Sequence, residues 1–163
     1  MNKQLEIVQL EELKDRQIPA FGFELLREVL LPDLLGRDLP QILYWAGKGL
    51  ARKHPVNSIE ELFEFFKIAG WGNLALLHNK KNEMEFELSG EFISLRFKKA
   101  NAPTFQLEAG FLAEQLQMMN NYITETYEQE KKRANKVIFT VKWGQKDILH
   151  DEPSLRKRSH RKP

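Results

Sequence analysis

The chain has 163 residues, with 25 Lys or Arg against 23 Asp or Glu and no cysteine, a composition typical of one globular domain. Without cysteine there is no disulfide, no thiolate metal site and no cysteine nucleophile. No apolar run approaches the roughly 20 residues that cross a bilayer. The segment Met1 to Leu13 also lacks the apolar core of a secretory signal, so we expect a cytoplasmic protein.

The net charge of +2 hides an asymmetry between the body and the end of the chain. Five basic residues lie between Arg156 and Pro163, and removing them leaves 20 basic against 23 acidic residues. A nucleic-acid surface requires basic residues clustered on the folded domain, so we expect such contact only through the tail. The predicted organisation is a polar leader at 1–16, one domain at 17–145 and a basic, disordered tail at 146–163.

Helical periodicity dominates the first half of the domain. A helix opened by Ile18-Pro19 is expected to end at Pro32 and Gly36, and Asp38 is expected to cap the next one. The expected buried stripe of that second helix is Ile42, Leu43, Ala46 and Leu50, with Tyr44 and Trp45 at its flanks. Gly47 and Gly49 are expected to allow another backbone to approach closely. Ser58 and Glu61 form a capping box for a third helix, which Gly70 ends.

From Trp71 the apolar period changes from 3.6 to 2, which indicates strands. We expect strands at 71–77, 84–88 and 93–97, a helix from Leu107 to Met119 around Gly110, and a final strand at 137–143. Residues 122–128 favour a strand that pairs with the last one, although Glu125 to Lys132 would also suit an exposed helix. The sequence thus predicts an α/β (α+β) fold with an antiparallel sheet of four to five strands.

No residue set forms a recognisable catalytic or metal site. The four histidines have no metal-ligand spacing, and they are His54, His78, His150 and His160. Gly70-Trp71-Gly72 follows a helix and precedes a strand, the reverse of a phosphate-binding turn, so we expect a packed corner there. Glu108 interrupts an apolar helical segment; it is either an exposed or helix-capping carboxylate or a partly buried acid with a raised pKa.

Aromatic residues are abundant, with 11 Phe, 3 Trp and 3 Tyr. They either form the core or line an apolar pocket or a dimer surface. The candidate ligand-binding residues are Tyr44, Trp45, Phe66, Trp71, Phe111 and Glu108. The glycines expected to allow close backbone packing are Gly47, Gly70, Gly72 and Gly110.

Four segments resemble the YslB-like family of Gram-positive bacteria: Phe21 to Arg27, Gly36 to Lys48, Ala69 to Gly72 and Gln106 to Ala113. That family is similar to 4-vinyl reductase-type domains, to the TRAPP core subunits and to haem-based nitric-oxide sensors. The resemblance, over residues 17–145, implies a ligand-binding domain of the NO-signalling/Golgi-transport type. It also implies helices on one side of the sheet and dimerisation through N-terminal helices. The chain lacks the cysteines and the helical histidine of those relatives, so we expect no lipid, metal, haem or other cofactor.

The main functional hypothesis is a non-enzymatic domain that binds a hydrophobic small molecule or a protein partner as a homodimer. One alternative is an enzyme or enzyme accessory acting on a tetrapyrrole-like ring, with Glu108 as its acid. Another is a ligand-free interaction scaffold whose basic tail contacts an anionic surface.

Overall fold

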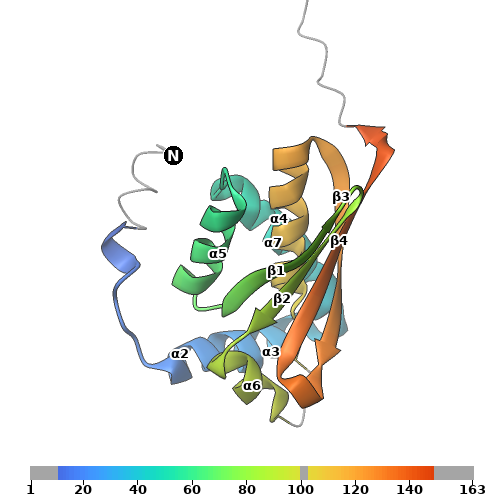
Figure 1. Cartoon of the computed structure of the whole chain (residues 1–163). Coiled ribbons are helices and arrows are strands. Elements are labelled where there is room, and N and C mark those ends of the chain that lie inside the picture. The colour runs from blue at the N-terminus through green and yellow to red at the C-terminus, as the bar shows by residue number, and fades with distance from the viewer. Residues whose placement is uncertain (1–10, 100–102, 149–163) are drawn as a thin grey trace, which may run out of the picture.

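A computed structural model describes residues 11–99 and 103–148 of the chain (Figure 1). Four antiparallel strands form one sheet in the order β1-β2-β4-β3, and the helices cover one of its faces (Figure 1). The strands are β1 (Asn73–Lys80), β2 (Glu83–Ser89), β3 (Tyr122–Lys131) and β4 (Lys136–Ile148). The predicted α+β fold class and its antiparallel sheet are confirmed.

Alternating side chains of the two central strands build the floor of the core. Phe86 and Leu88 on β2 pair in register with Phe139 and Val137 on β4, and all four are fully buried. Because successive side chains of a strand point to opposite faces, the intervening Glu and Ile or Thr residues face away from the helices. The sheet therefore offers one apolar face, which α7 (Gln106–Asn120) covers from Glu108 to Leu116.

The backbones of α7 and α4 (Leu39–Lys53) touch at two glycines. A Cβ on Gly47 would overlap Leu107 O and lie 2.8 Å from Phe111 N, and a Cβ on Gly110 would lie 2.7 Å from Tyr44 C. No side chain fits at either position, so glycine sets the distance between the helices. Gly49 has no atom within 4 Å of its Cβ position, so its predicted close packing is wrong.

This crossing also fixes the rotation of α4. Its buried residues are Leu43, Gly47 and Ala51, while Ile42 is 41% exposed and Ala46 faces solvent. Leu43 is buried and Leu50 packs against the core as predicted, whereas the prediction for Ile42 and Ala46 is wrong. Because the closest contact is made by a glycine, which hydrophobic periodicity does not weight, the apolar pattern placed these two residues on the wrong face.

The third predicted helix is α5 (Ile59–Ile68), and its start was predicted correctly. The Ser58 hydroxyl accepts a hydrogen bond from Glu61 N at 3.1 Å, while the Glu61 carboxylate accepts from Asn57 N at 2.8 Å. Gly70 follows the helix with φ +70° and has no atom near its Cβ position, so it serves the turn rather than close packing. Gly72, in contrast, is pressed against Ser89 O, 2.7 Å from its Cβ position.

The first helical run ends at Gly36 as predicted, but it continues through Pro32, which was also expected to end it. It consists of α2 (Ala20–Glu24), a π-helical segment η1 (Leu25–Leu30) and α3 (Leu31–Leu35), and Pro32 stands in the first turn of α3. Proline is tolerated there, because the first amides of a helix have no partner within it. Gly36 ends the run with φ +57° and starts η2 (Gly36–Asp38). Asp38 precedes α4 as predicted, but its side chain makes no capping hydrogen bond.

The strand predicted at 93–97 is wrong, because α6 (Glu91–Phe97) is a helix. Ile93 and Arg96 are buried, and Phe97 packs at the edge of the core. Their spacing of three and four residues is that of one helical face. Gly90, with φ +136°, turns the chain out of β2, and the Ser94 hydroxyl donates to Gly90 O. Seven residues are too few for apolar alternation to separate the two periods.

The hairpin at the end of the domain is as predicted. β3 and β4 pair in register from Lys131 and Lys136, with a short 3-10 turn (Lys132–Ala134) and Asn135 in the left-handed region between them. The strand interpretation of residues 122–128 therefore holds over the helical one. β4 runs to Ile148, and the rest of the predicted tail lies outside the described residues, as do leader residues 1–10.

Candidate functional site

The N-terminal helical run has its polarity reversed. Its inner side carries Glu24, Arg27 and Glu28, of which Arg27 is 7% exposed. The π-helical segment η1 contains both Arg27 and Glu28, so two consecutive charged side chains are directed into the protein. Single π turns inside helices often occur at functional sites. The run thus turns its charges toward the domain.

Arg27 reaches the middle of α7. Its Nη2 donates to both carboxylate oxygens of Glu108 at 2.6 Å, and Glu108 is fully buried. The expectation that this carboxylate is exposed or caps the helix is wrong. The alternative that it is buried holds, but its charge is paired. Removing both charges from water costs free energy, which only close contact between the two groups offsets.

A second buried arginine lies beside the first. Arg96 of α6 is 6% exposed; its Nε lies 2.6 Å from Glu28 Oε1 and its Nη2 donates to Thr104 O at 2.7 Å. Its guanidinium lies over the Phe105 ring, 4.1 Å from the centroid, in cation–π geometry. Burial and the nearby positive charge of Arg27 lower the pKa of Arg96, although an arginine stays charged at any working pH.

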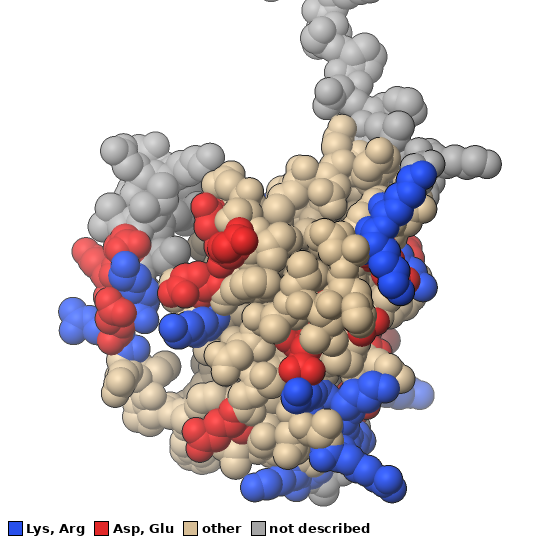
Figure 2. Space-filling view, viewed as in Figure 1, with Lys and Arg blue, Asp and Glu red and all other residues tan. Residues whose placement is uncertain are grey.

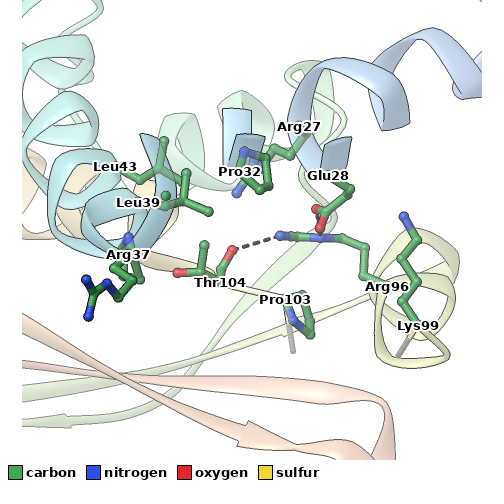
Figure 3. A pocket seen from close by; sticks show the side chains of 12 residues that line it. Arg27, Glu28, Pro32, Arg37, Leu39, Leu43, Arg96, Lys99, Pro103 and Thr104 are labelled. Carbon is green, nitrogen blue, oxygen red and sulfur yellow. Dashed lines mark hydrogen bonds and ion pairs between the residues drawn. The ribbon is translucent and has the colours of Figure 1, made fainter. Parts of the chain in front are cut away.

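These residues border a cavity of about 410 Å³, called the charged pocket below. Figure 3 shows it between the start of α4, the π-helical segment, α6 and the loop before α7. Its charged lining consists of Arg27, Glu28, Arg37, Arg96 and Lys99. Its other lining residues are Pro32, Gly36, Leu39, Pro40, Leu43, Pro103 and Thr104. This volume is within the range of small-molecule sites, about 300 to 1,000 Å³.

The outer side of the same helical run is apolar and faces solvent. Its large side chains are exposed by between 43% and 70%: Phe21, Leu25, Leu26, Val29, Leu30 and Leu34. We call these six residues the outer face. Asp33 is the single charged residue among the exposed positions of 21–34. Hydrophobic patches of this kind mark interaction sites.

A second, shallower hollow lies where α4 meets β3. It contains Tyr44, whose Oη accepts a hydrogen bond from Thr126 N at 3.2 Å, and Glu128, which accepts from Phe105 N at 2.9 Å. Burial raises the pKa of Glu128 to about 7, while the Phe105 amide opposes that shift. This carboxyl group therefore titrates near neutral pH.

The aromatic candidates separate into two groups. Phe66, Trp71 and Phe111 belong to the core, where Trp71 meets each of the other two rings edge-on at 5.0 and 5.2 Å. None of them lines the charged pocket or the hollow between α4 and β3. Trp45 is 60% exposed, whereas Tyr44 is partly buried against the core and is hydrogen-bonded to β3, and Lys48 lies above both rings. The predicted set therefore does not gather at one place.

The described part of the chain contains no group of three or more His, Asp or Glu arranged to hold a metal ion. The His54 backbone carbonyl accepts a hydrogen bond from the Gln115 side-chain amide at 2.7 Å, a structural contact, and His150 and His160 lie outside the described residues. Across 11–99 and 103–148 no helix has the length and apolarity needed to cross a membrane.

Sequence reasoning missed Arg27 and Arg96 altogether. Both stand at positions where a helical pattern should place an apolar residue: Arg27 is four residues after Phe23, and Arg96 is three after Ile93. A charge on the core side of an amphipathic pattern is a signal of a buried ion pair. For Arg96 that signal was hidden by the strand interpretation.

Comparisons with known proteins show the family and the fold. Residues 20–142 match the family described as "Protein of unknown function (DUF2507)". The chain is 55% identical over 138 residues to the "Uncharacterized protein YslB" of Bacillus subtilis (strain 168), covering 85% of this chain and 93% of that protein.

The fold resembles the crystal structure of a vinyl-4-reductase family protein from Methanocaldococcus jannaschii, with a TM-score of 0.65. That likeness covers 89% of this chain and 97% of the other at 24% identity, which shows a shared fold. The family match and the relative together give the identity that the sequence motifs had indicated: the chain belongs to the YslB-like family of proteins of unknown function.

Proposed function

We propose that the protein is a non-enzymatic binding domain that works as a homodimer, joined through the outer face of its N-terminal helices. The observation that carries this proposal is the reversed polarity of most of the run: the six apolar side chains of the outer face are exposed to solvent, while Arg27 is buried and Glu28 is nearly so. Apolar surface in contact with water is unfavourable in free energy, so the outer face of this run is not stabilised by solvent. A protein surface there would remove the exposed apolar area from solvent.

A second copy of the chain fits this face better than a different protein does. The outer face carries no basic residue and a single acidic neighbour, so it offers no charge pattern that would select a distinct partner. In a two-fold interface the same patch meets itself, and a uniformly apolar helix is complementary to its own copy. The expected N-terminal dimerisation of the superfamily supports the same arrangement.

The ligand-binding part of the proposal rests on the charged pocket. The buried aromatic rings fill the core, so they favour packing over a cavity for an apolar molecule. Catalysis by Glu108 finds no support, because its carboxylate is fully buried and accepts two hydrogen bonds from Arg27. Binding without turnover is the function that this arrangement favours.

The test is the mass of the protein in solution. Sedimentation equilibrium of the full chain should give twice the monomer mass, and the double variant Leu26→Glu/Leu30→Glu should give the monomer mass. Both leucines are exposed in the single chain, at 61% and 46%, so their replacement should leave the fold intact by circular dichroism. Leu77→Glu, at 41% exposure on the edge strand β1, is the matched control and should stay dimeric. A monomeric wild type would overturn the proposal.

A further inference from the structure

Resting on the binding function just proposed, we propose that the charged pocket holds an organic anion. The carboxylate or phosphate group would lie against the arginines and Lys99, and an apolar body would lie against the leucines and prolines on the α4 side, where Arg37 also lies (Figure 3). The pocket's charge, its unsatisfied donors and its two-sided lining each support this ligand class.

The lining has an excess of positive charge. Four of its side chains are cations, Arg27, Arg37, Arg96 and Lys99, and Glu28 is the one acid among the lining residues. Glu108 and Glu24 offset part of this charge from outside the lining, through their ion pairs with Arg27 and Lys99. Arg37 has no ion pair with any residue in the described part of the chain. One positive charge thus remains for a ligand.

The buried arginine retains an unused donor. The Arg27 side chain is only 7% exposed, and its Nε has no hydrogen-bond partner among the described residues. A buried N–H without a partner costs on the order of 1 to 3 kcal/mol, more for a charged group. Arginine prefers flat, forked acceptors such as carboxylate and phosphate. An anion in the pocket would supply the acceptor that the protein does not.

The two buried arginines each have a carboxylate partner within the chain. Arg27 binds Glu108 directly, Arg96 Nε lies 2.6 Å from Glu28 Oε1, and Arg96 Nη1 lies 3.8 Å from Glu108 Oε1. The charge that these pairs leave for a ligand is therefore that of Arg37, and the free donor is Arg27 Nε.

The apolar wall of the pocket favours a ligand whose acidic group is carried on an apolar ring or chain. Figure 3 shows Leu39 and Leu43 on the α4 side of the pocket, facing Arg96 and Lys99 on the α6 side across Thr104. Pro32 and Pro40 extend the apolar wall. A free inorganic ion would leave this wall wet, whereas a ring or short chain carrying one acidic group would cover it.

The surface near α6 would attract such a ligand. Figure 2 shows Lys and Arg side chains gathered at the end of the molecule where α6 and the β3–β4 turn lie. The exposed basic residues there are Lys98, Lys131, Lys132 and Arg133. A surface of one sign raises the local concentration of the opposite charge and speeds its arrival, most strongly at low salt.

The experiment is calorimetric titration of the full chain with four probes at low ionic strength: inorganic phosphate, phenyl phosphate, benzoate and benzyl alcohol. We expect phenyl phosphate or benzoate to bind more tightly than benzyl alcohol and than inorganic phosphate. Whichever of the two binds more tightly names the acidic group. If neither aromatic anion binds, or if benzyl alcohol binds as well as they do, the arginines form only a structural ion-pair network and the inference is wrong.

The double variant Arg37→Gln/Lys99→Gln locates the binding without removing the buried Arg27–Glu108 pair. It should weaken binding of the better anion by more than about tenfold, because each lost charge-assisted contact accounts for roughly that factor. Lys98→Gln/Arg133→Gln removes the same charge from the same end, outside the pocket, and should change binding less than about threefold. Equal losses in the two variants would overturn the assignment.

The same titration on Leu26→Glu/Leu30→Glu separates this inference from the homodimer. That variant changes the outer face and leaves every lining residue of the charged pocket in place. If the wild type is monomeric but binds the anion, the homodimer proposal fails and the pocket stands. If the wild type is dimeric and binds no anion, the reverse holds.

Discussion

At the scale of single residues, Glu128 is a carboxyl group whose environment gives the domain a pH response. Burial raises its pKa to about 7 from 4.5, so the folded chain holds this proton more tightly than the unfolded chain does. The free energy of unfolding should therefore fall as the pH rises from about 4.5 to 7, and be level with respect to this group above that window.

Glu128→Gln should remove this decrease in the free energy of unfolding, because an amide carbonyl can still accept a hydrogen bond from Phe105 N and has no charge to bury. At pH 8 the variant should be more stable than the wild type by at most about 3 kcal/mol, and near pH 4 the two should be similar. Urea unfolding at the two pH values measures the difference. A difference that does not change with pH would contradict the raised pKa.

The buried pair of Arg27 and Glu108 is expected to matter more when broken than when replaced. Arg27→Met leaves the buried Glu108 carboxylate with Arg96 alone, at 3.8 Å, and should destabilise the fold by up to about 3 to 5 kcal/mol. Arg27→Met/Glu108→Leu removes both charges and should recover much of that loss. Unfolding of the single and double variants by urea forms the test, with Lys80→Met, from a solvent-exposed pair, as a control expected to change little.

The residue scale is also where sequence reasoning had least to work with. Arg27, Arg96 and Glu108 meet from three separate segments, and no local pattern states that they are partners. Glu108 attracted attention because it interrupts an apolar run, yet its role depends on an arginine 81 positions earlier in the chain. Ion pairs between distant segments follow from the tertiary structure alone.

At the scale of elements, two glycines of α4 differ in their contact with α7: Gly47 lies at the crossing of the two helices and Gly49 does not. Gly47→Ala should destabilise the domain by about 1 to 3 kcal/mol, because its Cβ would overlap the α7 backbone at Leu107 O. Gly49→Ala meets no atom within 4 Å and should stabilise α4 by up to about 1 kcal/mol. Thermal unfolding of the pair reports opposite shifts in Tm; equal shifts would mean that the helices do not touch at Gly47.

Elements with strong local signals were predictable. The Ser58 cap, the Gly70 stop and the alternating strands β2 and β4 each have a local cause, and the structure has them where the sequence indicated. α6 was not, because Ile93, Leu95 and Phe97 alternate as a strand would. The buried face of α6 includes Arg96, and the burial of a charged side chain there is explained by its ion pair with Glu28.

At the scale of the whole molecule, the proposed homodimer would link stability to protein concentration through the outer face. If folding and association are coupled, dilution favours the unfolded monomer, and Tm should rise with protein concentration. Calorimetry at several concentrations of the wild type should show this, whereas Leu26→Glu/Leu30→Glu should unfold at a Tm independent of concentration. A concentration-independent Tm in the wild type would contradict a dimer that contributes to folding.

The overall architecture was open to prediction because the resemblance and the apolar periods agreed on one α+β domain. The reversed N-terminal run was not. Its apolar positions were recognised as helical, but the pattern does not say which side faces the core, and hydrophobicity alone suggests the wrong one. The side that faces inward is set by where Glu108 and Arg96 need their partners.

The π-helical segment makes the length of the N-terminal run as important as its residues. A helix advances by about 100° per residue, so losing one residue between Phe23 and Pro32 would rotate everything before the deletion by that angle relative to α3. Arg27 and Glu28 hold their present directions only with this count. Relatives that are one residue shorter here should therefore also lack the acid at the position of Glu108, so that length and sequence change together.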